Sequence, residues 1–141
     1  MREYKFKGKN KDIGWVYGQL AYDINGNTYI IQEVELDSSY GLEETILFAT
    51  MWHRVDKETV GQYTGLKDKN GEIYEGDIVS FNLKSDSEGQ PNITGYIEYQ
   101  TTFSSYRIMS LKGSFALDYN IKDIEAIGNI YDNPELLEKG E

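Results

Sequence analysis

The chain has 141 residues and a formal net charge of −10, from 14 basic and 24 acidic side chains, and it contains no cysteine. This length suits one domain, or two small lobes, with a real hydrophobic core. The acidic balance disfavours binding to duplex nucleic acid, unless a local basic patch overrides the total charge. The lack of cysteine excludes disulfides, thiol catalysis and zinc–thiolate sites, and we expect no cofactor.

The chain also lacks signals for a membrane. No apolar run approaches the roughly 18 residues that a membrane-spanning helix needs. The N-terminal residues are charged but are not followed by the apolar stretch of a secretory signal. We therefore expect a cytoplasmic protein without a membrane partner.

The first region, residues 1–59, is predicted to be rich in β structure. Lys5-Phe6-Lys7 alternates with period two, which indicates a half-buried edge strand with its lysines turned to solvent. A basic arm for nucleic acid or for an acidic partner is the alternative interpretation. Two β-prone segments flank Asn25-Gly26, a strong tight-turn signal, so we expect a hairpin over residues 15–36.

The most apolar stretch of this region is Thr45–Val55, which follows a polar loop expected at 37–45. Periodicity does not separate strand from helix at this length, and the aromatic and β-branched content favours a strand. His53 is the only histidine. It has no obvious nucleophile or second ligand, so we expect a structural or exposed role. Asp56–Thr59 predicts a helical turn or cap.

The second region, residues 60–141, begins with a glycine-rich stretch. Asn70-Gly71 predicts a type I′ turn, because Asn and Gly best tolerate the positive φ angles of its two central residues. Gly76-Asp77 predicts a second bend, and Ile78–Phe81 begins a β-branched strand. The glycine spacing matches neither a phosphate loop nor a dinucleotide fingerprint, so the glycines are expected to shape turns.

Short strands are predicted along the rest of this region. A polar loop at 82–92 precedes alternating segments at Ile93–Gln100 and Tyr106–Leu111. Two further strands are expected near 114–117 and 124–131. Asn133 can cap a final short helix with Pro134 at its first position. The regular strand spacing fits an SH3-like small barrel or a two-sheet sandwich.

Three parts of the chain carry a family resemblance: the run Gly61–Gly71 with Ile73–Val79, the opening Met1–Lys7, and the ending Ile127–Leu137. Together they resemble the signature of the YopX family, small proteins of phages and prophages in Gram-positive bacteria. The resemblance implies a mostly β fold and a viral context. It implies no established activity and no catalytic residues. Where the family usually continues its opening with a basic–aromatic segment, this chain has Gly8–Trp15.

The expected fold is mainly β: an N-terminal β-hairpin region packed with a C-terminal small SH3-like barrel or two-sheet sandwich, and a short C-terminal helix. The alternative is one compact domain.

Four carboxylates cluster in the glycine-rich stretch, at Asp68, Glu72, Glu75 and Asp77. A calcium loop does not fit, because Gly71 falls at position four instead of six and no Glu stands at position twelve. A hydrolytic carboxylate pair is conceivable, although the spacing does not fix two carboxylates at a working distance. We expect solvated turn carboxylates, no catalytic residues and no metal site.

Twelve tyrosines are many for this length. They suit a half-buried sheet face or a binding surface, because tyrosine has an apolar body and a polar tip. We expect a non-enzymatic interaction module that binds a phage or host protein. The candidate binding residues, chosen from their positions around the glycine-rich stretch, are Tyr63, Tyr74, Tyr96, Tyr99 and Arg107.

Two alternatives remain open: a small-barrel binder of single-stranded nucleic acid that stacks bases on aromatic rings, and a carboxylate-dependent hydrolase that uses residues 68–77. Sheet edges also allow a homo-oligomer, whose order is left open.

Overall fold

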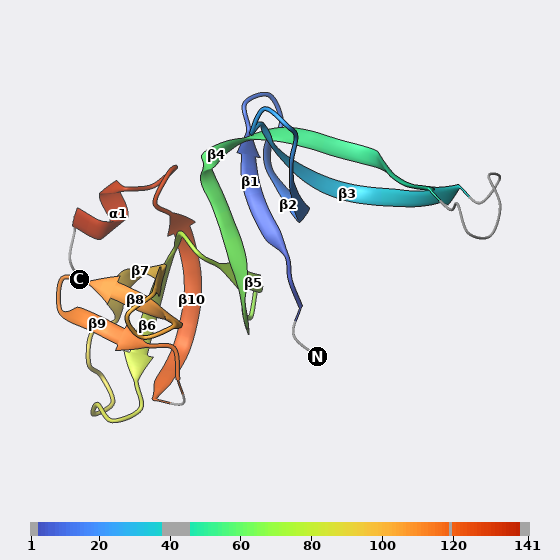
Figure 1. Cartoon of the computed structure of the whole chain (residues 1–141). Helices are drawn as coiled ribbons and strands as arrows, with labels where there is room; N and C mark the ends of the chain where they lie inside the picture. The colour runs from blue at the N-terminus through green and yellow to red at the C-terminus, as the bar shows by residue number, and fades with distance from the viewer. Residues whose placement is uncertain (1–2, 38–45, 119, 139–141) are drawn as a thin grey trace. The chain divides into compact units, whose positions relative to one another are not determined.

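The computed structural model describes residues 3–37, 46–118 and 120–138. These residues confirm the mainly β fold, with two antiparallel sheets and a short C-terminal helix (Figure 1). The chain forms two compact units, Met1–Gln62 and Tyr63–Glu141. The division expected between residues 59 and 60, and the SH3-like character of the second region, stay predictions.

The N-terminal unit is built on strands β1 (Phe6–Asn10), β2 (Gly14–Tyr22), β3 (Thr28–Asp37) and the first part of β4 (Ile46–Asp68). Strand β1 pairs with both β2 and β4, while β3 pairs with β2 and β4, so the four strands close a ring of pairings. Its core consists of three buried residues with partly buried apolar neighbours: Val16, Ile30 and Val55, with Phe6, Leu20 and Val60.

Two predictions for this unit are confirmed. The hairpin of β2 and β3 encloses Asn25-Gly26, although the connection runs over residues 23–27, where the amide of Asp23 donates to the carbonyl of Asn27 at 3.1 Å. The apolar stretch after residue 45 is a strand, as its β-branched and aromatic content indicates. The predicted loop at 37–45 falls outside the described residues, except that Asp37 ends β3.

Two other predictions were wrong. Strand β1 is not an edge strand, and Lys7 is not turned to solvent: Lys7 is 4% exposed, and its Nζ lies 4.5 Å from the ring centre of Trp15. The half-buried Trp15 ring explains how a lysine is tolerated there, since an aromatic face attracts a cation. Residues 56–59 form no helical turn. They belong to β4, where the register with β1 shifts between Lys7 and Lys9.

The C-terminal unit contains the end of β4 and the shorter elements that follow: β5 (Gly71–Tyr74), β6 (Asp77–Leu83), β7 (Ile93–Gln100), β8 (Ser105–Ser110), β9 (Gly113–Ala116), β10 (Ile121–Asn129) and α1 (Glu135–Glu138). Five of these strands form one sheet in the order β10-β6-β7-β8-β9. The predicted loop before Ile93 is present, although β6 continues through residues 82 and 83, which were expected in that loop; the predicted strands after the loop are confirmed within a few residues of their expected bounds.

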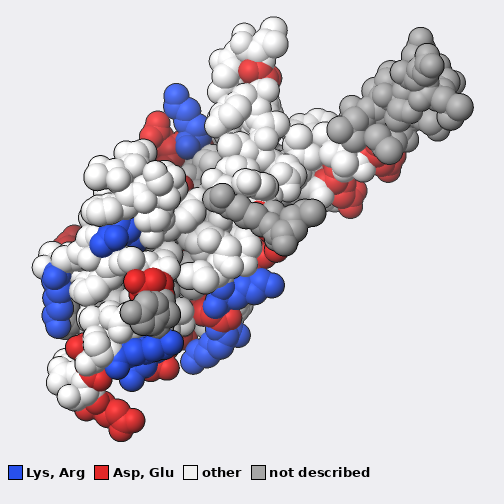
Figure 2. All heavy atoms as spheres, turned by 60° about the horizontal axis from the view of Figure 1, so that its bottom comes forward, with Lys and Arg blue, Asp and Glu red and all other residues white. Residues whose placement is uncertain are grey.

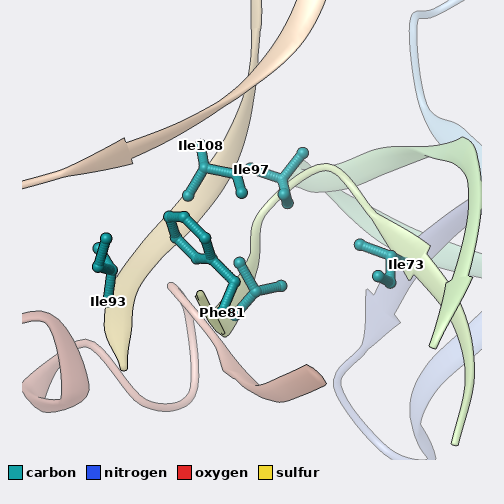
Figure 3. Packing of buried hydrophobic residues seen from close by; sticks show 6 residues of the cluster. Ile73, Phe81, Ile93, Ile97 and Ile108 are labelled. Carbon is teal, nitrogen blue, oxygen red and sulfur yellow. The ribbon is translucent and has the colours of Figure 1, made fainter. Parts of the chain in front are cut away.

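A cluster of buried aliphatic and aromatic side chains forms the core of this unit. Phe81 and Ile108 are fully buried, and Figure 3 shows the Phe81 ring beside the isoleucines of the neighbouring strands. The ring also meets Phe115 edge to face, with 5.4 Å between ring centres. Gly95 allows the close approach of β7 to β8, because a Cβ there would lie 2.6 Å from the Met109 carbonyl oxygen.

Two local details differ from expectation. In the β4–β5 hairpin, Asp68 pairs with Gly71, so Lys69 and Asn70 are the central turn residues, and Asn70 does not adopt positive φ. The predicted type I′ turn at Asn70-Gly71 is therefore wrong. The helix after Pro134 is present, but the Asn133 side chain accepts from the Asn129 amide at 3.2 Å instead of capping that helix.

Candidate functional site

The carboxylate of Asp68 ties three backbone amides together. Its Oδ1 accepts from the amides of Asn70 and Gly71 at 2.8 and 2.9 Å, and its Oδ2 accepts from the amide of Ala126 at 2.7 Å. The first two bonds fix the β4–β5 turn, which explains why the turn uses Lys69 and Asn70. The third bond joins this turn to strand β10. Asp68 therefore has a clear structural role.

Two of the neighbouring carboxylates, those of Glu72 and Asp77, also have partners within the fold. Asp77 is 7% exposed, and its Oδ2 accepts from the Tyr74 amide at 2.8 Å. The Glu72 Oε1 accepts from the Tyr74 hydroxyl at 3.0 Å. Within residues 3–37, 46–118 and 120–138, no group of three or more His, Asp and Glu side chains is arranged to hold a metal ion.

The candidate tyrosines differ in how accessible they are. Tyr63 and Tyr74 are 5% and 2% exposed, and their ring centres lie 5.6 Å apart on paired strands. Tyr96 is half-buried, and its hydroxyl donates to Glu98 at 3.3 Å. Burial, with the nearby Glu98 charge, raises the pKa of Tyr96 above its usual 10.0. These three rings offer little free surface to a partner.

The other two candidates lie together at the β7–β8 hairpin. Tyr99 pairs with Tyr106, and their rings meet edge to face at 5.1 Å between centres. The Arg107 guanidinium lies 4.4 Å from the ring centre of Phe103, which is 59% exposed at the turn. We call Tyr99, Phe103, Tyr106 and Arg107 the aromatic tip.

Neighbouring residues hold the aromatic tip in place. The Nε of Arg107 donates to the Ser114 hydroxyl at 2.6 Å, and its Nη2 donates to the Ser114 carbonyl at 3.3 Å. The turn itself contains Ser104 at a φ of 49°, an uncommon conformation for a residue other than glycine. Sequence reasoning missed Phe103. The signal available was a large apolar residue in the short polar link between two predicted strands.

The described helix is too short to cross a membrane, so no membrane-spanning helix is found in the described ranges. Fold and site together define a small two-unit β protein with a partly exposed aromatic–arginine cluster on a hairpin. The chain belongs to the YopX family, because the family model described as YopX protein matches residues 5–138. The resemblance inferred from its motifs is thus confirmed.

A solved structure supports the fold. The crystal structure of protein EF1440 from Enterococcus faecalis matches with a TM-score of 0.57 and 20% identity, over 97% of this chain and 99% of that chain. At this identity the likeness concerns the fold alone. The search among curated proteins gives no match.

Proposed function

We propose that this protein is a non-enzymatic interaction module of a phage or prophage, which binds a phage or host protein in the cytoplasm of the host cell. The observation that carries the proposal is the aromatic tip, where Phe103 is exposed and Arg107 stacks on it. Aromatic residues, phenylalanine among them, and arginine are enriched at the core of protein interfaces.

The aromatic tip has the features of a binding site prepared in advance. The hydrogen bonds from Arg107 to Ser114 and the contact between Tyr99 and Tyr106 restrict three of its side chains. Side chains that are already restricted lose less conformational entropy when a partner binds. An exposed aromatic side chain beside a restrained arginine is therefore a suitable anchor for a partner with an apolar pocket and an acidic rim.

Binding of single-stranded nucleic acid is the alternative for the same residues, because bases stack on aromatic rings and on arginine. The net charge of −10 favours a protein partner, since an acidic molecule repels phosphates. A carboxylate hydrolase is the second alternative. The backbone bonds of Asp68 and Asp77 weaken it, because these bonds occupy carboxylate oxygens that chemistry would need.

The test is a pull-down of the tagged full chain from phage-induced host lysate, with and without nuclease, read by mass spectrometry. The variants are wild type, the double variant Phe103→Ala/Arg107→Ala, and Leu111→Ala as the control. Leu111 is 78% exposed at the neighbouring β8–β9 turn, so its truncation also removes exposed apolar surface.

We expect one partner protein to co-purify with the wild type and to remain bound after nuclease treatment. The Leu111→Ala variant should retain this partner, and the double variant should lose it. Enrichment that disappears with nuclease would instead favour the nucleic-acid binder. Equal recovery with all three proteins would reject the aromatic tip as the binding site.

A further inference from the structure

The N-terminal unit contains an open cleft of about 750 Å³, a volume within the range of small-molecule sites. It lies where the turns after β1 and β2 meet strand β4. We call it the N-terminal cleft; its lining residues include Lys9, Lys11, Asn27, Thr28, Arg54 and Lys57. All of them belong to one compact unit.

Positive charge gathers in this cleft although the chain as a whole is acidic. Its lining contains four basic side chains, from Lys9, Lys11, Arg54 and Lys57, and Asp56 as the acidic one. The Asp56 Oδ1 already accepts from the Glu58 amide at 3.0 Å. Among the described residues, the ammonium groups of Lys11 and Lys57 have no hydrogen-bond or ion-pair partner. Figure 2 shows acidic and basic side chains mixed over one face of the molecule, unlike the mainly basic lining of the N-terminal cleft.

A chain of hydrogen bonds orients the arginine of the cleft. Arg54 Nη2 donates to the Asn27 Oδ1 at 2.6 Å, and Asn27 Nδ2 donates to the Asp23 Oδ2 at 2.9 Å. The Tyr29 hydroxyl also donates to this oxygen at 3.0 Å. Because the direct partner of Arg54 is a neutral amide, the guanidinium is held in position while other N–H donors stay available to a ligand.

A buried hydroxyl provides an independent observation. Thr28 lines the cleft and is 3% exposed, and its Oγ1 has no hydrogen-bond partner among the described residues. Buried hydroxyls in native proteins are almost always paired, because an unpaired one loses its hydration without compensation. The hydroxyl is covered in the free protein, so a small local shift that opens it to the cleft would let an oxygen of a ligand accept this hydrogen bond.

Irregular backbone builds the cleft wall. The register of β1 with β4 jumps from Lys7 opposite Gly61 to Lys9 opposite Asp56, so the intervening residues of β4, Lys57 among them, bulge out of the ladder. The wall is braced, because the Lys9 amide donates to the Thr59 Oγ1 at 2.9 Å and this hydroxyl donates to the Asp56 carbonyl at 2.6 Å. Bulges of this kind re-aim side chains beside binding sites.

We propose that the N-terminal cleft binds a small phosphorylated molecule, with Arg54 as the anchor of a phosphate group and Thr28 as a hydroxyl donor. Arginine matches the geometry of phosphate oxygens with two parallel N–H donors. The lysines supply further charge, which suits a diphosphate better than a single carboxylate. This site is independent of the aromatic tip, and either proposal can fail without the other.

The test is isothermal titration calorimetry of the full chain with inorganic pyrophosphate at constant ionic strength. The variants are Arg54→Gln, Thr28→Val, and Lys112→Gln as the control, because Lys112 is an exposed lysine of the C-terminal unit. We expect saturable 1:1 binding, weakened at least tenfold by Arg54→Gln and threefold or more by Thr28→Val. Binding to Lys112→Gln should stay within twofold of wild type.

Thr28→Val separates ligand binding from a merely structural role, since the valine should raise the melting temperature while it lowers affinity. A melting temperature that falls, or affinity that is unchanged, would overturn the assignment of Thr28. Absence of saturable binding, or equal affinity of Arg54→Gln and wild type, would overturn the site. Two further ligands test the ligand class. Tighter binding of citrate than of pyrophosphate, or competition by an oligothymidylate with steep salt dependence, would overturn the proposal that the ligand is a small phosphorylated molecule.

Discussion

Asp68 offers a sharp test of how the glycine-rich stretch is held together. Its carboxylate accepts from the amides of Asn70, Gly71 and Ala126 at 2.7–2.9 Å. Asp68→Ala removes all three hydrogen bonds. At about 1 kcal/mol net for each bond, we expect the free energy of unfolding to fall by about 3 kcal/mol. Asp68→Asn keeps one carbonyl oxygen but turns an NH₂ group toward another N–H donor, so we expect a loss of about 2 kcal/mol.

The assay is guanidinium denaturation followed by circular dichroism, with Asp86→Ala as the control for the lost charge. Asp86 lies exposed in the loop between β6 and β7, and its carboxylate has no hydrogen-bond or ion-pair partner among the described residues, so its removal should change stability by less than about 0.5 kcal/mol. If Asp68→Ala were as stable as Asp86→Ala, the three bonds would not hold the turn against β10, and the structural role of Asp68 would be refuted.

Three further predictions concern the two units. Phe81→Ala empties the centre of the C-terminal core, so we expect the free energy of unfolding in denaturant to fall by about 3–5 kcal/mol. Phe81→Leu should lower it clearly less, and equal losses for the two variants would contradict this expectation. Gly95→Ala places a Cβ 2.6 Å from the Met109 carbonyl oxygen and should cost about 1–3 kcal/mol in the same assay, whereas wild-type stability would show that the strands separate freely. The hydrogen bond from the Asn27 side chain, with backbone amides, lowers the pKa of Asp23 to about 2 from 3.8. Because the folded pKa is the lower one, the stability from Asp23 is present above about pH 4 and is lost as the pH falls toward 2. A carboxyl titration by NMR should show the Asp23 pKa rising in Asn27→Ala, and an unchanged value would reject the role of Asn27.

Much of the strand pattern was predictable, because it depends on local composition. The β2–β3 hairpin, the strand after residue 45 and the strands of the C-terminal sheet follow from β-branched and aromatic residues between turn signals. Turn details were less predictable. The side chain of Asp68 bonds to the amides of Asn70 and Gly71, and this bonding shifted the turn by one residue from its glycine signal.

Lys7 shows a different limit of sequence reasoning. Its alternation with Phe6 correctly indicates a strand, but alternation does not reveal how many neighbours that strand has. Strand β1 pairs on both sides, and on one side its partners lie 47 to 56 positions further along the chain; this long-range pairing buries Lys7 against Trp15.

The candidate sites depend even more on long-range contacts. The aromatic tip needs the register that brings Tyr99 opposite Tyr106, and this register follows from neighbouring strands whose pattern was predicted. The N-terminal cleft needs Arg54 beside Asn27, which are separated by a whole hairpin. Neither the residue pattern nor the spacing indicates that these two residues are in contact. The sequence therefore allowed for a local basic patch but did not show which residues would form it.

The most direct measurement of the proposed protein-binding role is site-specific photo-crosslinking in phage-induced host cells. A photoreactive p-benzoylphenylalanine replaces Phe103 in one protein and Leu111, the exposed residue at the next turn, in the control. We expect one discrete, nuclease-resistant protein adduct from position 103 and none from position 111. Adducts of equal yield from both positions, no protein adduct from position 103, or a nucleic-acid adduct there would contradict it.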